Sequence, residues 1–146
     1  MPKQKPLSII SKSAARIAAV QIFYNKIISN KSIKEVYQDY KSSFKCELEN
    51  DFKINSLNEE FLDLLLLGFN NNIDKEIEKL LARDWKLNRI SAVNKSILFA
   101  GIIELNIKND LTDNIIISEY LEIAEQMGGE VKFINKILDK ISKDLK

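Results

Sequence analysis

The sequence predicts an all-α protein that forms a single domain of six to seven helices. Apolar residues recur at helical spacing almost throughout the chain, whereas the alternation typical of strands is scarce. Only four glycines and two prolines are present, and both prolines lie in the first six residues, so no later proline breaks a helix. A chain of 146 residues buries roughly 70% of its unfolded surface, so it needs no metal or disulfide to fold.

The first helix is expected from about Ser8 to Ser29, preceded by a flexible basic arm at residues 1–7. The apolar residues of this helix predict a core stripe that consists of Ile10, Ala14, Ile17, Gln21 and Ile28. A second stripe holds three cations and one aromatic within about 80° of one another, namely Lys12, Arg16, Ala19, Phe23 and Lys26. This stripe is either a solvated edge with Phe23 packed under a neighbouring helix, or a contact surface for phosphates.

A capping box marks the start of the next helix. Ser32 can accept a hydrogen bond from the backbone N–H of Glu35, and the Glu35 side chain can reach back. The short helix that follows is expected to end near Ser43. Residues 44–55 show no clear period and are predicted to form a loop.

A second capping box, from Ser56 to Glu59, opens the apolar run LNEEFLDLLLLGF, which is wide enough for a central helix. The asparagines at 70–72 interrupt this run. The segment IDKEIEKLLARDW follows, and its apolar residues fall on one side, namely Ile73, Ile77, Leu80 and Leu81. Trp85, after the end of this segment, is interpreted as a core anchor rather than a binding platform.

The segment SAVNKSILFAGIIELNI is apolar nearly all round, so its helix should be buried in the middle of the domain. Glu104 lies within this helix, between Ile103 and Leu105. A carboxylate in such a place is either a general acid/base or a buried group that fixes helix register through hydrogen bonds. We favour the second interpretation, because the chain has no histidine and no glycine-rich phosphate loop.

Two amphipathic helices complete the chain. Thr112 or Asp113 can cap the segment NIIISEYLEIAEQM, and Gly128 with Gly129 should end it. The last helix is predicted to point four residues inward, namely Phe133, Ile137, Leu138 and Ile141. Its outward residues are lysines and predict a solvated face, formed by Lys132, Lys136, Lys140 and Lys143.

The residue inventory excludes several kinds of site. Without histidine the chain can form no Ser-His-Asp triad, no Cys-His pair and no zinc site of the ordinary type. Cys46 is the only cysteine, which excludes an intrachain disulfide and is compatible with a reducing compartment. Glu119 and Glu122 are a weak metal candidate, because no third ligand accompanies them. We therefore expect a cytoplasmic protein that has no metal, no cofactor and no membrane span.

Charge is unevenly distributed although the whole chain carries only +1. Residues 1–45 contain nine Lys or Arg and two acids, a net charge of +7, so the remainder carries −6. A basic end on an acidic body either marks a surface for a polyanion or reflects a chance clustering of solvated lysines. Charge by itself does not separate these interpretations.

Three stretches of the chain form a recognisable pattern, namely AARIAAVQIFY, DWKLNRISAVNKSILFAGIIEL and IIISEYLEIAEQMGGEVKFINKILDKI. In their order and spacing, from Ser11 to Leu145, they resemble the NusB family of bacterial transcription antitermination factors. The resemblance implies a helical fold of two subdomains and no enzymatic activity. It also implies binding of a short single-stranded RNA element, boxA, jointly with NusE, a small-subunit ribosomal protein. Other Nus factors and RNA polymerase would join them, and transcription of ribosomal RNA operons would become more processive.

The resemblance also implies site residues. Lys12 and Arg16 match an arginine run in the family and are expected to contact RNA phosphates, with support from Lys3, Lys5 and Lys132. Tyr24 and Ile28 match positions at which the family meets NusE. Whether the chain is a monomer or a homodimer stays open.

Departures from the family pattern indicate a diverged member with fewer phosphate contacts. Only Lys12 and Arg16 remain of the arginine run, and Phe99 replaces an arginine that could have paired with Glu104 or Glu119. An alternative is therefore a helical protein-interaction module that has lost most RNA affinity. Some RNA methyltransferases carry a similar domain, but these 146 residues contain no cofactor-binding βαβ segment, so an enzyme is not expected.

Overall fold

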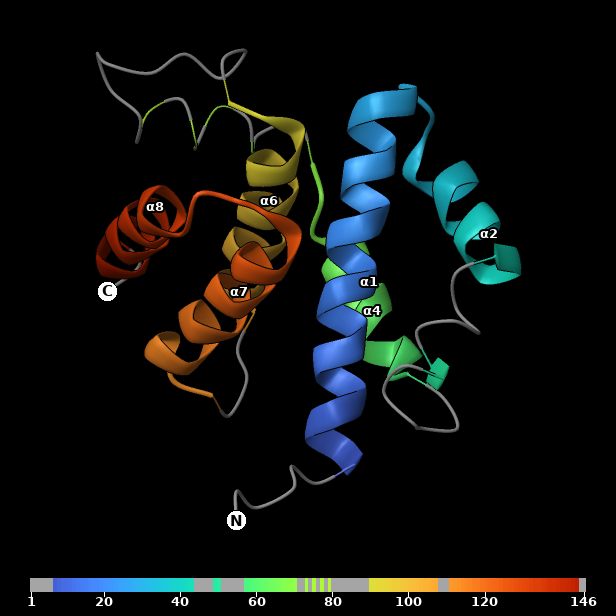
Figure 1. Cartoon of the computed structure of the whole chain (residues 1–146), viewed down its shortest axis with the longest axis horizontal. Helices are drawn as coiled ribbons and strands as arrows, with labels where there is room; N and C mark the ends of the chain where they lie inside the picture. Colours follow the sequence, from blue (N-terminus) through green and yellow to red (C-terminus); the bar gives the residue numbers. More distant parts are fainter. Residues whose placement is uncertain are drawn as a thin grey trace. The chain divides into compact units, whose positions relative to one another are not determined.

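The fold is all-α, as predicted, and Figure 1 traces it in a computed structural model. The structure describes residues 7–43, 49–50, 57–70, 73, 75, 77, 79, 90–107 and 111–144. Within them lie the helices α1 (Leu7–Ser29), α2 (Ile33–Ser43), α4 (Glu59–Leu67), α6 (Ala92–Asn106), α7 (Asp113–Met127) and α8 (Val131–Asp144), and no strand. Contacts divide the chain into two compact units, Met1–Leu67 and Gly68–Lys146, which agrees with two helical subdomains.

In the first unit, α1 packs against both α2 and α4. Its buried apolar residues are Ala14, Ala15, Ala18, Ala19, Val20, Ile22 and Phe23. The predicted core stripe was therefore wrong in part: Ile10, Ile17 and Gln21 are only half-buried, and Ile28 is 59% exposed. A single stripe describes a helix with one neighbour, whereas two neighbouring helices cover a wider arc of α1, and the alanines allow close approach.

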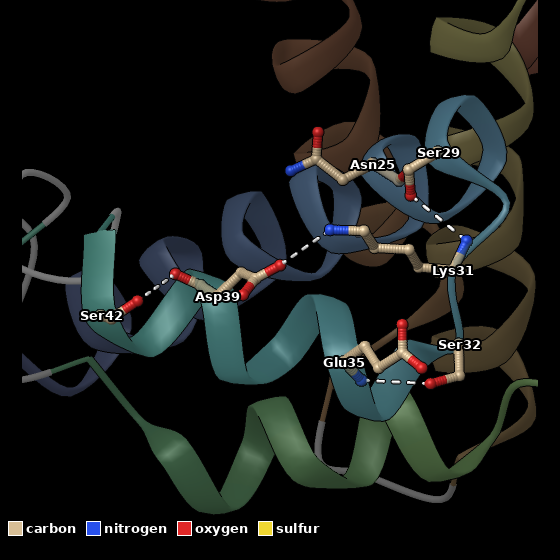
Figure 2. Close-up of polar contacts among 7 residues, drawn as sticks. All are labelled: Asn25, Ser29, Lys31, Ser32, Glu35, Asp39 and Ser42. Carbon is tan, nitrogen blue, oxygen red and sulfur yellow. Dashed lines mark hydrogen bonds and ion pairs between the residues drawn. The ribbon is translucent and has the colours of Figure 1, made fainter.

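The turn between α1 and α2 is built from short polar side chains, which Figure 2 draws. Asn30 has a φ of 60°, and its N–H donates to the carbonyl of Lys26 at 3.0 Å. The Ser32 hydroxyl then accepts from the N–H of Glu35 at 3.2 Å, so the predicted first half of the capping box is confirmed. Lys31 and Asp39 form an exposed ion pair at 3.5 Å.

The start of α4 corrects the second predicted capping box. The Oδ1 of Asn58 accepts from the N–H of Phe61 at 2.9 Å, and Ser56 lies outside the described residues. Asn58 precedes the first helical residue, Glu59, and asparagine is as good an N-cap as serine. The helix therefore begins two residues later than a capping box at Ser56 would place it.

α2 and α4 are linked by a hydrogen bond in which Tyr37 Oη donates to Asp63 Oδ1 at 2.8 Å. Burial, and then this hydrogen bond, raise the pKa of the Tyr37 phenol. Burial likewise raises the pKa of Tyr40, which lies three residues along α2 and is 2% exposed. Both phenols therefore stay protonated at neutral pH.

The second unit is formed by α6, α7 and α8, each of which contacts the other two. The side chains of α6 are buried from Ser96 through Leu105, as the apolar sequence predicted. Thr112, one of the two predicted candidates, caps α7 by accepting from the N–H of Ile115. Gly128 ends α7 in the left-handed conformation at φ 77°, which confirms the glycine stop.

Close approaches hold these three helices together. A side chain at Gly101 of α6 would place its Cβ 3.0 Å from Leu138 of α8, so the Leu138 side chain would have to shift to make room for it. Asn94 of α6 is buried, and its Oδ1 accepts from the N–H of Glu130 at 3.0 Å, just before α8 begins. Ser142 of α8 donates to Asp113 Oδ2 at 2.6 Å.

The two faces of α8 separate as predicted. The lysines 132, 136, 140 and 143 are all exposed, whereas Ile134, Ile137, Leu138 and Ile141 are buried. Phe133, predicted to point inward, is half-buried. Lys143 pairs with Asp139 one turn earlier, at 3.1 Å.

Several predictions fall on residues that the structure does not describe. They concern residues 1–6 of the predicted arm, most of the loop at 44–55 with Cys46, and Leu80, Leu81 and Trp85. Leu7, the last residue of the predicted arm, is instead the first residue of α1. Ile73 and Ile77 are described as helical and buried, in agreement with their predicted face. No described helix is long and apolar enough to cross a membrane.

Candidate nucleic-acid and partner interface

The two cations of α1 that the sequence singled out meet at one aromatic ring. Lys12 Nζ lies 5.6 Å from the ring centroid of Phe61, and Arg16 Cζ lies 5.2 Å from the same centroid. Both distances are within the range of a cation–π interaction. Lys12 and Arg16 stand one helical turn apart on α1, and Phe61 comes from the first turn of α4. We call these three residues the Phe61 cluster.

The cluster does not present both cations to solvent. Lys12 is half-buried, whereas Arg16 is only 2% exposed. Arg16 would reach an RNA phosphate only if its side chain moved, so its predicted phosphate contact stays a prediction. Lys12 is the more accessible member of the pair.

Backbone contacts fix the position of Phe61 beside these cations. The N–H of Asn58 donates to the carbonyl of Ser11 at 3.2 Å, which joins the start of α4 to α1 one residue before Lys12. The side chain of Asn58 then caps the N–H of Phe61. Sequence reasoning missed Phe61, because its helical period marks it as a core residue and only tertiary packing places two cations on its ring.

The rest of the cation stripe is covered by the protein to different degrees. Ala19 and Phe23 are completely buried, and Lys26 is half-buried. The interpretation of Phe23 as a residue packed under a neighbouring helix is confirmed. The stripe therefore changes along α1, from the Phe61 cluster to hydrophobic core.

The predicted partner residues lie further along α1. Tyr24 is half-buried, and Ile28, one turn later, is 59% exposed. An exposed isoleucine beside a partly exposed tyrosine offers apolar and hydrogen-bonding contacts, which suit a protein partner. The assignment of these two residues to a partner surface stays a prediction.

Lys132, the third described cation of the predicted RNA site, is exposed in the first turn of α8. It belongs to the second unit, whereas Lys12 and Arg16 belong to the first. Lys3 and Lys5 lie outside the described residues. The contribution of these lysines to one site stays a prediction.

Glu104 has the structural surroundings that the sequence favoured. Its side chain is completely buried, and Tyr120 Oη of α7 donates to its Oε1 at 2.7 Å. Phe99, which stands where the family resemblance suggested an arginine, is 4% exposed and meets Phe69 edge-on at 5.7 Å between ring centroids. At Glu104, α6 is thus joined to α7 by the hydroxyl of Tyr120.

Among the described residues, no group of three or more acidic or sulfur ligands could hold a metal ion.

Comparison with known proteins shows which family the chain resembles. The profile of the NusB family matches residues 13–143. The transcription antitermination protein NusB of Caulobacter vibrioides is 34% identical over 139 residues, which cover 91% of this chain and 93% of that protein. The NusB of Nitrobacter hamburgensis is 31% identical, over 90% of this chain and 86% of that protein.

Solved structures share the fold. NusB of T. maritima superposes with a TM-score of 0.67 at 22% identity, covering 97% of this chain and 93% of that chain. A chain from the crystal structure of a plectonemic RNA supercoil superposes with a TM-score of 0.72 at 20% identity, covering 92% of this chain. The fold is thus that of a helical protein of two small bundles. The chain belongs to the NusB family of transcription antitermination proteins.

Proposed function

We propose that this protein binds boxA-like single-stranded RNA together with NusE, the small-subunit ribosomal protein, and acts with other Nus factors and RNA polymerase. In this role it makes transcription of ribosomal RNA operons more processive. It works in the cytoplasm as a binding factor and carries out no reaction of its own. The observation that carries the proposal is the accessible cation Lys12 on the first helix of a NusB fold, where its Nζ lies over the ring of Phe61 from α4.

The RNA side of the proposal assigns phosphate contacts to lysines. Lys12 is the principal contact, with Lys3, Lys5 and Lys132 in support. A lysine that neutralises a phosphate releases a bound counterion, so its contribution falls with salt. Arg16 adds positive potential from its buried position, and direct contact would require its side chain to move.

The protein side of the proposal assigns NusE to the C-terminal half of α1. Tyr24 and Ile28 are separated by one helical turn and lie on the same side of the helix. Ile28 is 59% exposed, so it can enter an apolar pocket of a partner without unfolding α1. Burying such a side chain at an interface contributes through the area removed from water.

RNA binding is tested by fluorescence anisotropy with a labelled boxA-like oligonucleotide, with and without NusE. Lys12→Gln should weaken binding by about threefold to tenfold, the loss expected of one phosphate contact. Lys41→Gln is the matched control: it removes one exposed cation from α2 that also lies over a ring, with Nζ 4.4 Å from the centroid of Tyr37. The control should bind within about twofold of the wild type.

The same assay can reject the proposal. If the wild type binds no boxA-like RNA at low salt, with or without NusE, the RNA function is wrong. Equal losses for Lys12→Gln and Lys41→Gln would indicate attraction by overall charge, without a site at Lys12.

NusE binding is tested separately by calorimetry. Ile28→Asp should weaken NusE binding at least about tenfold, because it places a charge in an apolar contact. Leu64→Asp on α4 is the control, since Leu64 is also exposed (47%) and belongs to the same unit. Equal affinities for the two variants would remove Ile28 from the partner surface.

A protein-interaction module that has lost most RNA affinity is the second candidate. The burial of Arg16 favours it, because one of the two family-matched cations is withdrawn from the surface. This candidate predicts tight NusE binding that Ile28→Asp weakens, and RNA binding that Lys12→Gln leaves unchanged. The two assays together therefore separate the candidates.

A further inference from the structure

We propose that Phe61 is a positioning residue for RNA binding, whose ring holds the Lys12 side chain ready to meet a phosphate. The inference rests on the proposed RNA function and adds a residue from α4 that touches no RNA itself. Its basis is that both cations of α1 lie within 6 Å of one nearly buried ring, which is 7% exposed.

The Phe61 ring reduces the repulsion between two positive charges on α1. Lys12 and Arg16 stand at i and i+4, where like charges repel each other. The face of an aromatic ring is negative and attracts cations, most strongly where water is excluded. Phe61 therefore offsets part of the repulsion between Lys12 and Arg16, which lie on the same side of one helix.

The ring also reduces the flexibility of Lys12. A free lysine side chain has many rotamers and loses rotamer entropy when it is fixed in one conformation. A side chain that already packs on a ring has lost part of this freedom before RNA arrives, so binding costs less. Phe61 thus acts on RNA affinity through the conformation of Lys12.

The position of Phe61 is fixed well enough for this role. The N–H of Asn58 donates to the carbonyl of Ser11, and the Asn58 side chain caps the N–H of Phe61. These two hydrogen bonds connect the backbone beside Lys12 to the backbone of Phe61 through a single residue.

The test is a double-mutant cycle on the full chain, read by anisotropy with a boxA-like oligonucleotide in the presence of NusE. Phe61→Leu should weaken RNA binding about threefold in the wild-type background and less than about 1.5-fold in the Lys12→Gln background. Phe61→Tyr keeps the ring and should bind within about 1.5-fold of the wild type. Phe69→Leu, which removes a ring packed on Phe99 in the other unit, should leave RNA binding unchanged.

A second readout needs no RNA. In the wild type, the ring current of Phe61 should shift the NMR signals of the Lys12 side-chain methylenes upfield, and Phe61→Leu should abolish the shift. Thermal unfolding confirms that each variant is folded at the assay temperature.

The outcomes separate this inference from the proposed function. If the wild type binds RNA and Phe61→Leu has the same effect in both backgrounds, Phe61 does not act through Lys12 and the inference is wrong, while the RNA function stands. An unshifted Lys12 signal in the wild type would also overturn it. If the wild type binds no RNA, the proposed function and this inference fall together.

Discussion

At the residue scale, hydrogen bonds compensate for the polar side chains that this protein buries in its core. Glu104 is completely buried on α6 and accepts a hydrogen bond from Tyr120 of α7. A buried carboxylate is costly unless it is hydrogen-bonded, so each donor to it matters. Tyr37 and Asp63 form the same kind of pair in an exposed position, at 2.8 Å.

This contrast gives a prediction about stability. Tyr120→Phe removes one donor to buried Glu104 and should lower the free energy of unfolding by about 1–3 kcal/mol. Tyr37→Phe removes the exposed bond, where water can replace the phenol, and should cost only about 0.5–1 kcal/mol. Urea unfolding followed by circular dichroism measures both. An equal cost for the two variants would contradict a structural role for the buried pair.

At the element scale, helix ends decide where the chain turns. Ser32, Ser91 and Thr112 each accept from the N–H three residues later, at the starts of α2, α6 and α7. Gly128 ends α7 with a φ of 77°, which other residues adopt only at a cost. Asn58 performs the capping role for α4 and also donates its own N–H to Ser11.

The cap of α4 is tested by two alanine variants. Asn58→Ala should lower the free energy of unfolding by about 0.5–2 kcal/mol, since the N–H of Phe61 loses its side-chain acceptor. Ser56→Ala is the control, because the structure assigns the capping role to Asn58, and it should cost less than about 0.5 kcal/mol. Chemical denaturation measures the free energy of unfolding of both variants. A larger cost at Ser56 would restore the capping box that the sequence suggested.

At the scale of the whole molecule, charge separates along the chain. Residues 1–45 carry +7 and the rest carry −6, so a weak net charge conceals a strongly basic first third. The structure places Lys12 and Arg16 of this basic third together at Phe61, while Lys132 of α8 is exposed in the second unit.

Salt dependence counts the phosphate contacts of the whole molecule. If Lys3, Lys5, Lys12 and Lys132 each neutralise one phosphate of single-stranded RNA, log K should fall with log salt with a slope of about −3. Lys12→Gln should reduce this slope by about 0.7, whereas Lys41→Gln should leave it unchanged. Anisotropy titrations at several salt concentrations, with NusE present, measure the slope. A magnitude below about 1 would mean that at most one of the four lysines contacts a phosphate.

Much of the fold could be predicted, because the helices and their ends depend on local patterns of residue type and spacing. The bounds of α1 and α2, the cap at Ser32 and the stop at Gly128 follow from spacing and residue type. For the cap of α7 the sequence left Thr112 and Asp113 as alternatives, and the structure selects Thr112. The core stripe of α1 could not be predicted in full. Its arc depends on α2 and α4 packing against one helix from two directions, which no single helical period encodes.

The candidate site was predictable only as a list of cations. Helical spacing and the family resemblance point to Lys12 and Arg16. Neither of them predicts that Arg16 is buried while Lys12 is only half-buried. Phe61 lies 45 positions after Arg16 in the sequence and has the period of an ordinary core residue. Neither its contact with both cations nor the link from Asn58 to Ser11 has a local signal.

The sequence by itself determined the all-α class, most helix ends, the basic first third and the family, since each depends on residue type and on spacing along one chain. The tertiary structure alone decided which cation is buried, which ring the cations share, and which tyrosine meets Glu104. These features depend on side chains that are distant in sequence, and burial is set by whichever helix covers them. Helical periodicity determines which residues share a face of a helix, and tertiary packing determines which other residues that face contacts.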